Sequence, residues 1–303
     1  MAHLEASKLF SVQGLVAVIT GGGSGLGRIM ARALDANGAA KVFIIGRREQ
    51  NLKETASLAV NGTIVPVVGD VASKDSLQKA YDFIASQTEH IDLLVANSGV
   101  LGPLANPPAK SDGSPPTLAE LREHLWQTPM EDFTNVHHVN VTGAFYTAVA
   151  FLPLLDAANR KRPAPVPGTL SPPRPQIIVT SSIAGFMRAV PSGFAYNFSK
   201  AAVNSLIKTL STVLVGYNIR VNGIAPGIYH SEMSNPMFQS QGIPDKGITD
   251  ETVPREIIPL GRAGSEEDIA GVILWMASTA GGYLNGNIVV TDGGRLGQRP
   301  STY

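Results

Sequence analysis

The sequence predicts an α/β fold: one doubly wound parallel sheet of about seven strands, with helices on both faces. Short apolar, β-branched runs alternate with longer amphipathic stretches, and this alternation is typical of parallel strands joined by right-handed helical crossovers. The apolar runs are almost continuously hydrophobic, which indicates strands buried on both faces. Because strand-like runs continue to the C-terminus and no linker divides them, we expect a single domain over positions 1–303.

Seven segments have the composition of buried strands. They are rich in Val, Ile and Leu, and turn-forming residues such as Gly, Asn, Asp or Pro flank most of them. The predicted strands are Leu15–Thr20, Lys41–Gly46, Thr63–Gly69, Ile91–Ser98, Gln176–Ser182, Ile219–Pro226 and Gly286–Asp292.

Helical patterns fill most of the intervals between these strands. Their apolar residues recur at the spacing that forms one buried helix face. The predicted helices are Gly27–Asn37, Ser76–Gln87, Glu131–Ala158, Ala195–Gly216 and Glu266–Ser278.

Two segments break the alternation and are interpreted as surface insertions. Positions 102–129 are rich in Pro, Ser and Gly, with a short helical piece near Leu118–Trp126. Positions 159–175 are basic and Pro-rich, which is typical of an exposed spacer.

Composition excludes several classes of function. A formal net charge of zero provides no long-range field for nucleic acid or an anionic membrane. We see no apolar run near the roughly 18 residues that span a bilayer, and no secretory signal at the start, so a cytoplasmic location is expected. The absence of Cys removes disulfides, thiol nucleophiles and Cys-ligated metals. His137 and His138 are adjacent and would face apart on a helix, so no metal site is predicted.

A glycine-rich turn follows the first predicted strand. In "AVITGGGSGLGRIM" the glycines stand between a strand and a helix, where they allow a tight turn and a close approach of a phosphate to the backbone. The N-terminus of the next helix would then attract a pyrophosphate. An ordinary strand–helix turn is the alternative. The residues expected to contact the dinucleotide here are Gly21, Ser24, Gly25, Leu26 and Gly27.

A phenol and an amine lie one helical turn apart in "AYNFSKAAV". Tyr196 and Lys200 share one face of a helix because residues four apart are neighbours there. The pair is either an ordinary surface contact or an acid whose pKa a nearby cation has tuned for proton transfer. The "VTSS" run, which ends with Ser181 and Ser182, closes the preceding strand, and ligands of doubly wound sheets bind at such carboxyl ends.

Together these motifs resemble the short-chain dehydrogenase/reductase family, which has a Rossmann-type fold. The similarity rests on Thr20-Gly21-x-x-x-Gly25-x-Gly27 and Tyr196-x-x-x-Lys200, and covers about Gly14 to Gly294 apart from the two insertions. It implies a catalytic set of Asn140, Ser182, Tyr196 and Lys200. The interval from Ser182 to Tyr196 is one residue longer than in most members, so the resemblance does not predict the structure of the loop Phe186–Gly193.

The resemblance also implies a chemistry for this set. Tyr196 would act as general acid, with Ser182 donating to the carbonyl oxygen. Lys200 would hold the nicotinamide ribose and, together with the charge of the nicotinamide, lower the pKa of Tyr196. Asn140 would fix a water that connects Lys200 with solvent.

The cofactor is expected to be NADP(H) rather than NAD(H). Gly46 stands where a ribose-binding acid is expected after the second strand, and Arg47 and Arg48 follow it, so a 2′-phosphate would meet guanidinium groups. Ser24 departs from the basic residue that many NADP-binding members carry in the turn. Further cofactor contacts implied by the resemblance are Asp70, Val71, Asn97, Gly99, Pro226, Gly227, Ile228 and Ser231.

The predicted function is the NADPH-dependent reduction of a ketone to a secondary alcohol. Positions 229–259 are long and apolar and are interpreted as a substrate lid, which favours a bulky or acyl-type ketone, as in the similar β-ketoacyl reductases. His230 in this lid is a candidate substrate contact. The alternatives are an NAD-dependent alcohol, polyol or sugar dehydrogenase and a dinucleotide-bound scaffold or sensor without turnover. A homo-oligomer, tetramer or dimer, would pair through the predicted helices Glu131–Ala158 and Ala195–Gly216.

Overall fold

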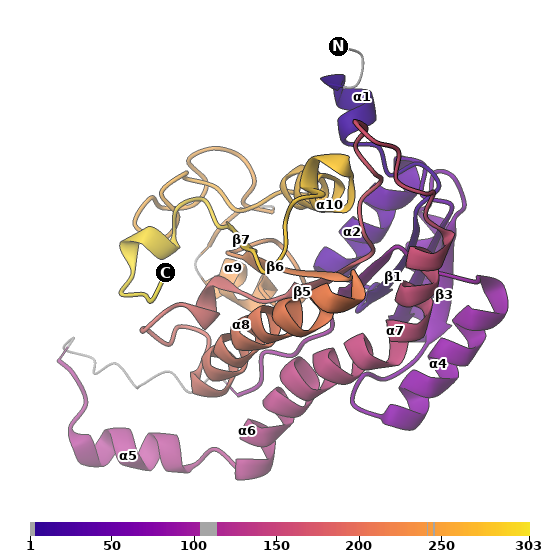
Figure 1. Ribbon diagram of the computed structural model, residues 1–303. Coiled ribbons are helices and arrows are strands. Elements are labelled where there is room, and N and C mark those ends of the chain that lie inside the picture. Colours follow the sequence, from indigo (N-terminus) through magenta and orange to yellow (C-terminus); the bar gives the residue numbers. More distant parts are fainter. Residues whose placement is uncertain (1–3, 104–113, 241, 245) are drawn as a thin grey trace.

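A seven-stranded parallel sheet forms the centre of the molecule (Figure 1). The computed structural model describes residues 4–103, 114–240, 242–244 and 246–303. The strand order is β3-β2-β1-β4-β5-β6-β7, and every neighbouring pair is parallel. This confirms the predicted fold class. The strands are β1 (Val16–Thr20), β2 (Lys41–Gly46), β3 (Ile64–Val68), β4 (Leu93–Ala96), β5 (Gln176–Thr180), β6 (Arg220–Pro226) and β7 (Ile288–Thr291).

Helices cover both faces of this sheet because alternate residues of each strand point to opposite sides. Val16 and Val18 of β1 belong to the core under α4, α7 and α8, whereas Ala17 and Ile19 belong to the core under α2, α3 and α10. The covering helices are α2 (Gly25–Ala36), α3 (Glu49–Ser57), α4 (Lys74–Gln87), α7 (Gly143–Lys161), α8 (Phe194–Leu214) and α10 (Glu266–Ala277).

The order in which the chain adds strands to the sheet reverses after β3, which places the switch point between β1 and β4. The chain runs outward from β1 to β3 and then returns to place β4 on the other side of β1. In such sheets the crevice at the carboxyl ends of the strands, at this switch point, is where ligands bind. Asn97 holds the strand ends together there: its Nδ2 donates to the Thr20 carbonyl at 3.0 Å, and its Oδ1 accepts from the Thr180 hydroxyl at 3.1 Å.

The predicted helix Glu131–Ala158 consists of two α-helices joined by a π-helical turn. They are α6 (Met130–His137), the turn His138–Thr142, and α7. The run Met130–Lys161 has a window of mean hydropathy 1.5 and is long enough to cross a membrane, so the expectation that no apolar run reaches this length is wrong. Phe151 and Leu155 of α7 are fully buried against the sheet, and this burial explains the apolar composition of a core helix.

The remaining elements are short. α5 (Leu118–Trp126) forms where predicted and begins with a capping box between Thr117 and Glu120. Positions 104–113 of the first insertion lie outside the described residues. The second insertion begins later than predicted, because α7 continues through Lys161 before the irregular stretch 162–175. The other short elements are α1 (Ala6–Leu9), α9 (Asn235–Ser240) and the 3₁₀ turns Ile183–Gly185, Val215–Tyr217, Thr279–Gly281 and Leu296–Gln298.

Two segments beyond the sheet pack over its carboxyl ends. The stretch after β6 has a small apolar cluster of its own, which includes Phe238 and Val253. The C-terminal tail lies against the loop that follows β5: Ser301 forms an antiparallel bridge with Met187, and the Thr302 N–H donates to the Phe186 carbonyl at 2.8 Å. Both segments therefore contribute walls to the crevice.

Candidate active site

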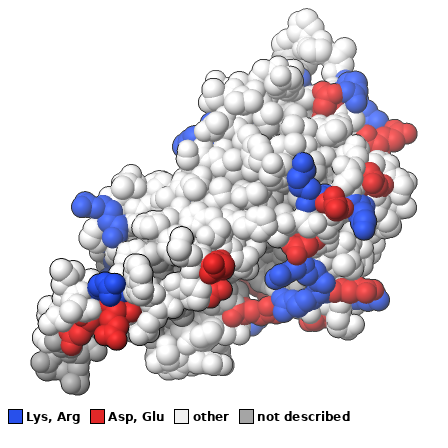
Figure 2. All heavy atoms as spheres, turned by 90° about the horizontal axis from the view of Figure 1, so that it is seen from below, with Lys and Arg blue, Asp and Glu red and all other residues white. Residues whose placement is uncertain are grey.

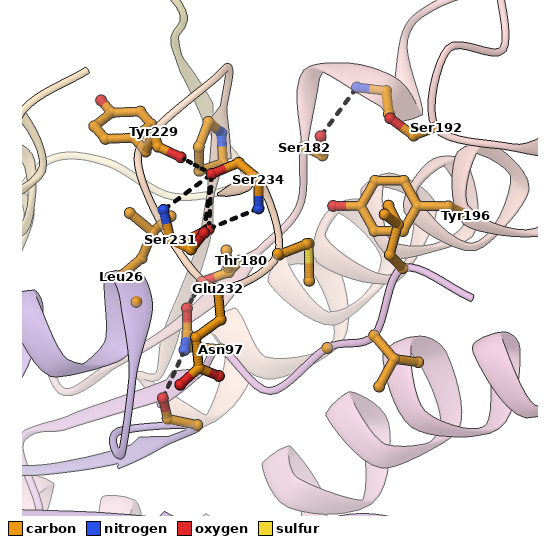
Figure 3. A pocket seen from close by; sticks show the side chains of 18 of the residues that line it. Leu26, Asn97, Thr180, Ser182, Ser192, Tyr196, Tyr229, Ser231, Glu232 and Ser234 are labelled. Atoms are coloured by element: carbon orange, nitrogen blue, oxygen red, sulfur yellow. Dashed lines mark hydrogen bonds between the residues drawn. The ribbon is translucent and has the colours of Figure 1, made fainter. Parts of the chain in front are cut away.

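A cavity of about 1080 Å³ occupies the crevice at the carboxyl ends of the strands. Its walls come from the turn after β1, the loops after β2 and β4, the start of α8, the segment after β6 and the C-terminal tail. Figure 3 shows side chains from several of these elements converging on one space. The volume is near the upper end of the range for ligand pockets, as expected for a site that holds two molecules.

The glycine-rich turn has the shape that a dinucleotide phosphate requires. Gly21 and Gly25 adopt φ of +69° and +52°, a conformation that L side chains rarely accept. A Cβ on Gly27 would lie 2.3 Å from the Gly21 carbonyl oxygen, so only glycine lets α2 approach the turn. Ser24 precedes α2 without capping it through its side chain, which leaves the helix N-terminus open to an anion. These residues fit a pyrophosphate.

Two arginines follow β2 on one wall of the cavity. Arg48 donates to Glu232 at 2.7 Å and to the Ser24 hydroxyl at 3.3 Å. Arg47 lines the same wall and has no ion pair or hydrogen bond within the part of the chain that the structure describes. Asp70, after β3, accepts from the Ala72 N–H at 3.0 Å. The wall next to β2 therefore offers two guanidinium groups, and of the carboxylates near it Glu232 is paired with Arg48 and Asp70 accepts a backbone N–H.

Tyr196 and Lys200 lie near the start of α8, where the helix meets the end of β5. Both side chains are buried, and the Lys200 Nζ lies 5.7 Å from the centre of the Tyr196 ring. Lys200 donates to the Thr180 carbonyl at 2.8 Å, which fixes the amine. The Tyr196 hydroxyl points into the cavity, with Ser182 on the same side (Figure 3). The helix therefore presents the phenol and the amine to one space.

Burial governs the electrostatics of this pair. Burial raises the pKa of Tyr196 above its usual value, and hydrogen bonding with Ser182 acts against this only in part. Burial also lowers the pKa of Lys200, to about 8. Without a bound dinucleotide, removal of the phenol from water therefore outweighs its hydrogen bond with Ser182, and the lowering expected in the presence of the nicotinamide charge stays a prediction. A neutral phenol is the form that can donate a proton.

Asn140 supports the site from behind instead of lining it. Its Oδ1 accepts from the Val100 N–H at 2.8 Å, and its Nδ2 donates to the Val100 carbonyl and the Ser199 hydroxyl, each at 3.0 Å. These bonds engage both ends of the side-chain amide, so Asn140 stiffens the wall, and its expected contact with a water stays a prediction. A Cβ on Gly99 would lie 3.2 Å from the Asn140 Oδ1 and 3.7 Å from the Lys200 Nζ, so both groups lie close to the Gly99 backbone.

The structure brings nearly all of the predicted site residues to one cavity. Gly27 and Asn140 stand behind the wall, and His230 stacks edge-on against Phe238, with ring centres 5.5 Å apart, and does not line the cavity. The predicted residues in the wall are Gly21, Ser24, Gly25, Leu26, Arg47, Arg48, Asp70, Val71, Asn97, Gly99, Ser182, Tyr196, Lys200, Pro226, Gly227, Ile228 and Ser231.

Sequence reasoning missed four kinds of wall residue. Thr180 positions Lys200, and Glu232 pairs with Arg48. Met187 and its neighbours before α8 form the wall beside Ser182, and the Asn197 side chain holds this loop by donating to the Ala189 carbonyl at 2.8 Å. Arg295 and Arg299 enter from the C-terminal tail. Of these wall residues, only those of the loop Phe186–Gly193 had a signal in the sequence, namely the one extra residue between Ser182 and Tyr196.

The sheet order, the glycine turn and the buried phenol–amine pair together define a dinucleotide-binding α/β protein. The chain belongs to the short chain dehydrogenase family, whose sequence profile matches residues 15–242. It is therefore an oxidoreductase of a family that binds nicotinamide dinucleotides.

Relatives cover the chain almost from end to end. It is 44% identical over 301 residues to the short-chain dehydrogenase/reductase PhomF of Diaporthe leptostromiformis, covering 99% of this chain and 97% of that protein. It is 30% identical over 287 residues to the rhamnolipids biosynthesis 3-oxoacyl-[acyl-carrier-protein] reductase of Pseudomonas aeruginosa, covering 94% and 97%. The solved Pseudomonas aeruginosa RhlG/NADP active-site complex superimposes with a TM-score of 0.76 at 29% identity, covering 95% and 98%.

Proposed function

We propose that this protein reduces a bulky or acyl-type ketone to a secondary alcohol with NADPH. The observation that carries the proposal is the buried Tyr196 hydroxyl, which points into the cavity beside Ser182 and has a pKa above its usual value. When bound, the nicotinamide supplies a hydride to the carbonyl carbon. The chain must then supply a proton to the carbonyl oxygen, and a neutral phenol held at that place can do so.

Each of the four predicted catalytic residues has a separate task in this proposal. Tyr196 transfers its Oη proton to the substrate oxygen. The Ser182 Oγ accepts from the Ala184 N–H at 3.2 Å, so its own hydrogen is directed to an acceptor such as the same oxygen as negative charge develops there. Lys200, anchored on the Thr180 carbonyl, stabilises the phenolate that remains. Asn140 keeps the Val100 backbone and α8 in register behind them.

The wall beside β2 supports a preference for NADP(H) over NAD(H). Arg47 is available to a 2′-phosphate without breaking any bond, and Arg48 reaches the same side of the glycine turn. Asp70 and Val71 would then flank the adenine. The turn Pro226-Gly227-Ile228 and Ser231 would contact the nicotinamide end.

The apolar wall supports a bulky substrate. The cavity that contains the Tyr196 hydroxyl is also lined by apolar side chains, namely Met187, Val190, Met233 and Met237. The segment 229–259 would act as a lid that excludes water from the reacting atoms. Within this segment Phe238, Val253 and Ile258 pack together in a small apolar cluster.

A homo-oligomer, tetramer or dimer, would form through α7 and α8. Phe145 and Val149 on α7 are 38% and 41% exposed, and Phe198 and Val213 on α8 are 53% and 54% exposed. Helices α5 to α8 lie along the lower side of Figure 1, and Figure 2 shows a broad area without Lys, Arg, Asp or Glu on the face seen from below. Exposed apolar side chains on neighbouring helices favour pairing with a second copy.

A comparison of both directions and both cofactors tests the proposed reaction. The assay follows NADPH or NADH absorbance over a panel of aryl and 3-oxoacyl ketones and, in reverse, over the matching alcohols and polyols. We expect kcat/KM for a ketone with NADPH to exceed every other combination. Faster turnover of a polyol or sugar with NAD would establish the alternative dehydrogenase, and dinucleotide binding without turnover would establish a scaffold.

A further inference from the structure

Two arginines from the C-terminal tail line the end of the cavity that the dinucleotide does not explain. Arg295 and Arg299 flank the 3₁₀ turn Leu296–Gln298, which follows β7. Because β7 and β3 are the opposite edges of the sheet, these arginines lie across β5 and the catalytic residues from Arg47 and Arg48. They contact the segment after β6 at Ile257 and Glu256, whereas Arg48 contacts that segment at Glu232, so the two pairs of arginines approach it at different places.

The tail that carries them is tied to the loop beside the catalytic serine. The Arg188 N–H donates to the Pro300 carbonyl at 2.8 Å, next to the bridge between Met187 and Ser301. Arg295 donates to the Ile257 carbonyl at 2.6 Å, which turns its guanidinium toward the segment after β6. The two arginines thus stand between the loop that follows Ser182 and the proposed lid.

No described carboxylate forms an ion pair with either guanidinium. The Arg295 guanidinium donates only to the Ile257 carbonyl among the described residues, and the Arg299 guanidinium makes one long hydrogen bond, 3.4 Å to the Glu256 carbonyl. Asp292, the nearest acid along the tail, accepts instead from the N–H groups of Gly294 and Leu296, at 2.9 and 2.6 Å. Two neighbouring cations without a counterion leave donors free for an anion.

The charges of this pair are close enough to repel each other. The pKa of Arg295 is lowered first by burial and then by the positive charge of Arg299, while Asp292 opposes this more weakly. The chain as a whole has a net charge of zero, yet the cavity wall contains Arg47, Arg48, Lys200, Arg295 and Arg299 against Asp70 and Glu232. An anion between Arg295 and Arg299 would relieve their repulsion.

We propose that Arg295 and Arg299 bind a carboxylate at the end of the ketone substrate opposite the reacting carbonyl. This substrate class deepens the proposed function and rests on it. The apolar side chains of Met187, Met233 and Met237 line the same cavity and would hold the hydrophobic skeleton between the two polar ends. Arg299, the more exposed of the two, selects the charge, and Arg295 orients it.

Matched ketones with and without the charge test the proposal. The probes are 6-acetyl-2-naphthoate and its methyl ester, reduced with NADPH. We expect the wild type to prefer the acid by about tenfold or more in kcat/KM, and Arg299→Gln to abolish most of that preference by raising KM for the acid. Activity on the ester and the Kd for NADPH should stay unchanged in the variant. Arg299→Lys should retain part of the preference.

Arg188→Gln is the matched control. Arg188 is exposed and lies on the loop to which the tail is tied, but it does not line the cavity. Its substitution should leave the ratio of acid to ester unchanged. If Arg188→Gln lowers the ratio as much as Arg299→Gln does, general surface charge explains the preference and the proposal is overturned.

A binding measurement separates this proposal from the proposed reaction. Titration calorimetry of 6-acetyl-2-naphthoate into the protein saturated with NADP⁺ needs no turnover, and we expect Arg299→Gln to weaken binding by about tenfold. Charge-dependent binding without reduction of either ketone would refute the ketoreductase and keep the anion site. Equal reduction of acid and ester by the wild type, or wild-type binding by Arg299→Gln, would refute the anion site and keep the ketoreductase.

Discussion

Removal of one carboxylate from the segment after β6 is expected to change the choice of cofactor. Glu232 holds Arg48 at 2.7 Å, and the two side chains are 58% and 59% exposed. A 2′-phosphate bound to Arg48 must replace this contact and would lie close to the displaced carboxylate. Glu232→Gln should therefore tighten the binding of NADPH and leave the binding of NADH unchanged.

The size of this effect follows from two contributions. Two phosphate charges at roughly 6 Å from one carboxylate repel it by about 1.4 kcal/mol in water, and physiological salt reduces this to about half. The exposed ion pair that must be broken contributes about 0–1 kcal/mol. The total of about 1 kcal/mol corresponds to a change in the Kd for NADPH of about three- to tenfold.

Fluorescence titration of both dinucleotides at low and at molar salt measures this effect. The effect should almost vanish at about 1 M salt, where the screening length is about 3 Å. Glu131→Gln, an exposed carboxylate on α6 outside the cavity, is the matched control. An unchanged Kd for NADPH in Glu232→Gln, or an equal gain for NADH, would refute the assignment of the phosphate to this wall.

Three further predictions concern the amine, the turn and the oligomer. Between about pH 8 and 9.5 the free energy of unfolding of the wild type should rise by about 1–2 kcal/mol relative to that of Lys200→Met. The reason is that the buried amine loses its charge above a pKa of about 8, whereas the amine of the unfolded chain keeps its charge. Urea denaturation measures both free energies, and the same pH dependence in both proteins would contradict this. Gly27→Ala should weaken NADPH binding more than about tenfold, since its Cβ would meet the Gly21 carbonyl at 2.3 Å, and an unaltered Kd would show that the turn relaxes. Val149→Lys should shift sedimentation from oligomer to monomer, and a monomeric wild type would exclude pairing through α7.

The strands were predictable because burial on both faces requires continuous apolar runs, and all seven formed where expected. α3 was not predicted, because in "EQNLKETAS" only Leu52 and Thr55 are buried, which is too few for a periodic signal. The π-helical turn His138–Thr142 was not predicted either. The spacing of apolar residues in this turn does not differ from that in the α-helices on both sides of it, so the sequence carries no signal for it.

The two halves of the site were unequally predictable. Most of the predicted residues between the turn after β1 and the start of α8 belong to local motifs, in which a turn or one helical turn determines the neighbours, and all of them except Gly27 and Asn140 line the cavity. Glu232 and Arg299 reach the cavity only through long-range packing of the segment after β6 and of the tail, and no spacing in the sequence records such contacts. The raised pKa of Tyr196 depends on burial, which the sequence pattern Tyr-x-x-x-Lys does not contain.

The most direct test of the account is the single-turnover rate of Tyr196→Phe, measured as NADPH consumption with saturating ketone beside the Kd for NADPH. The substitution removes only the hydroxyl that points into the cavity and keeps the buried ring. We predict a rate lower by about a thousandfold with an unchanged Kd, since a positioned acid contributes about 10²–10⁴. A rate within about tenfold of the wild type would show that another group delivers the proton.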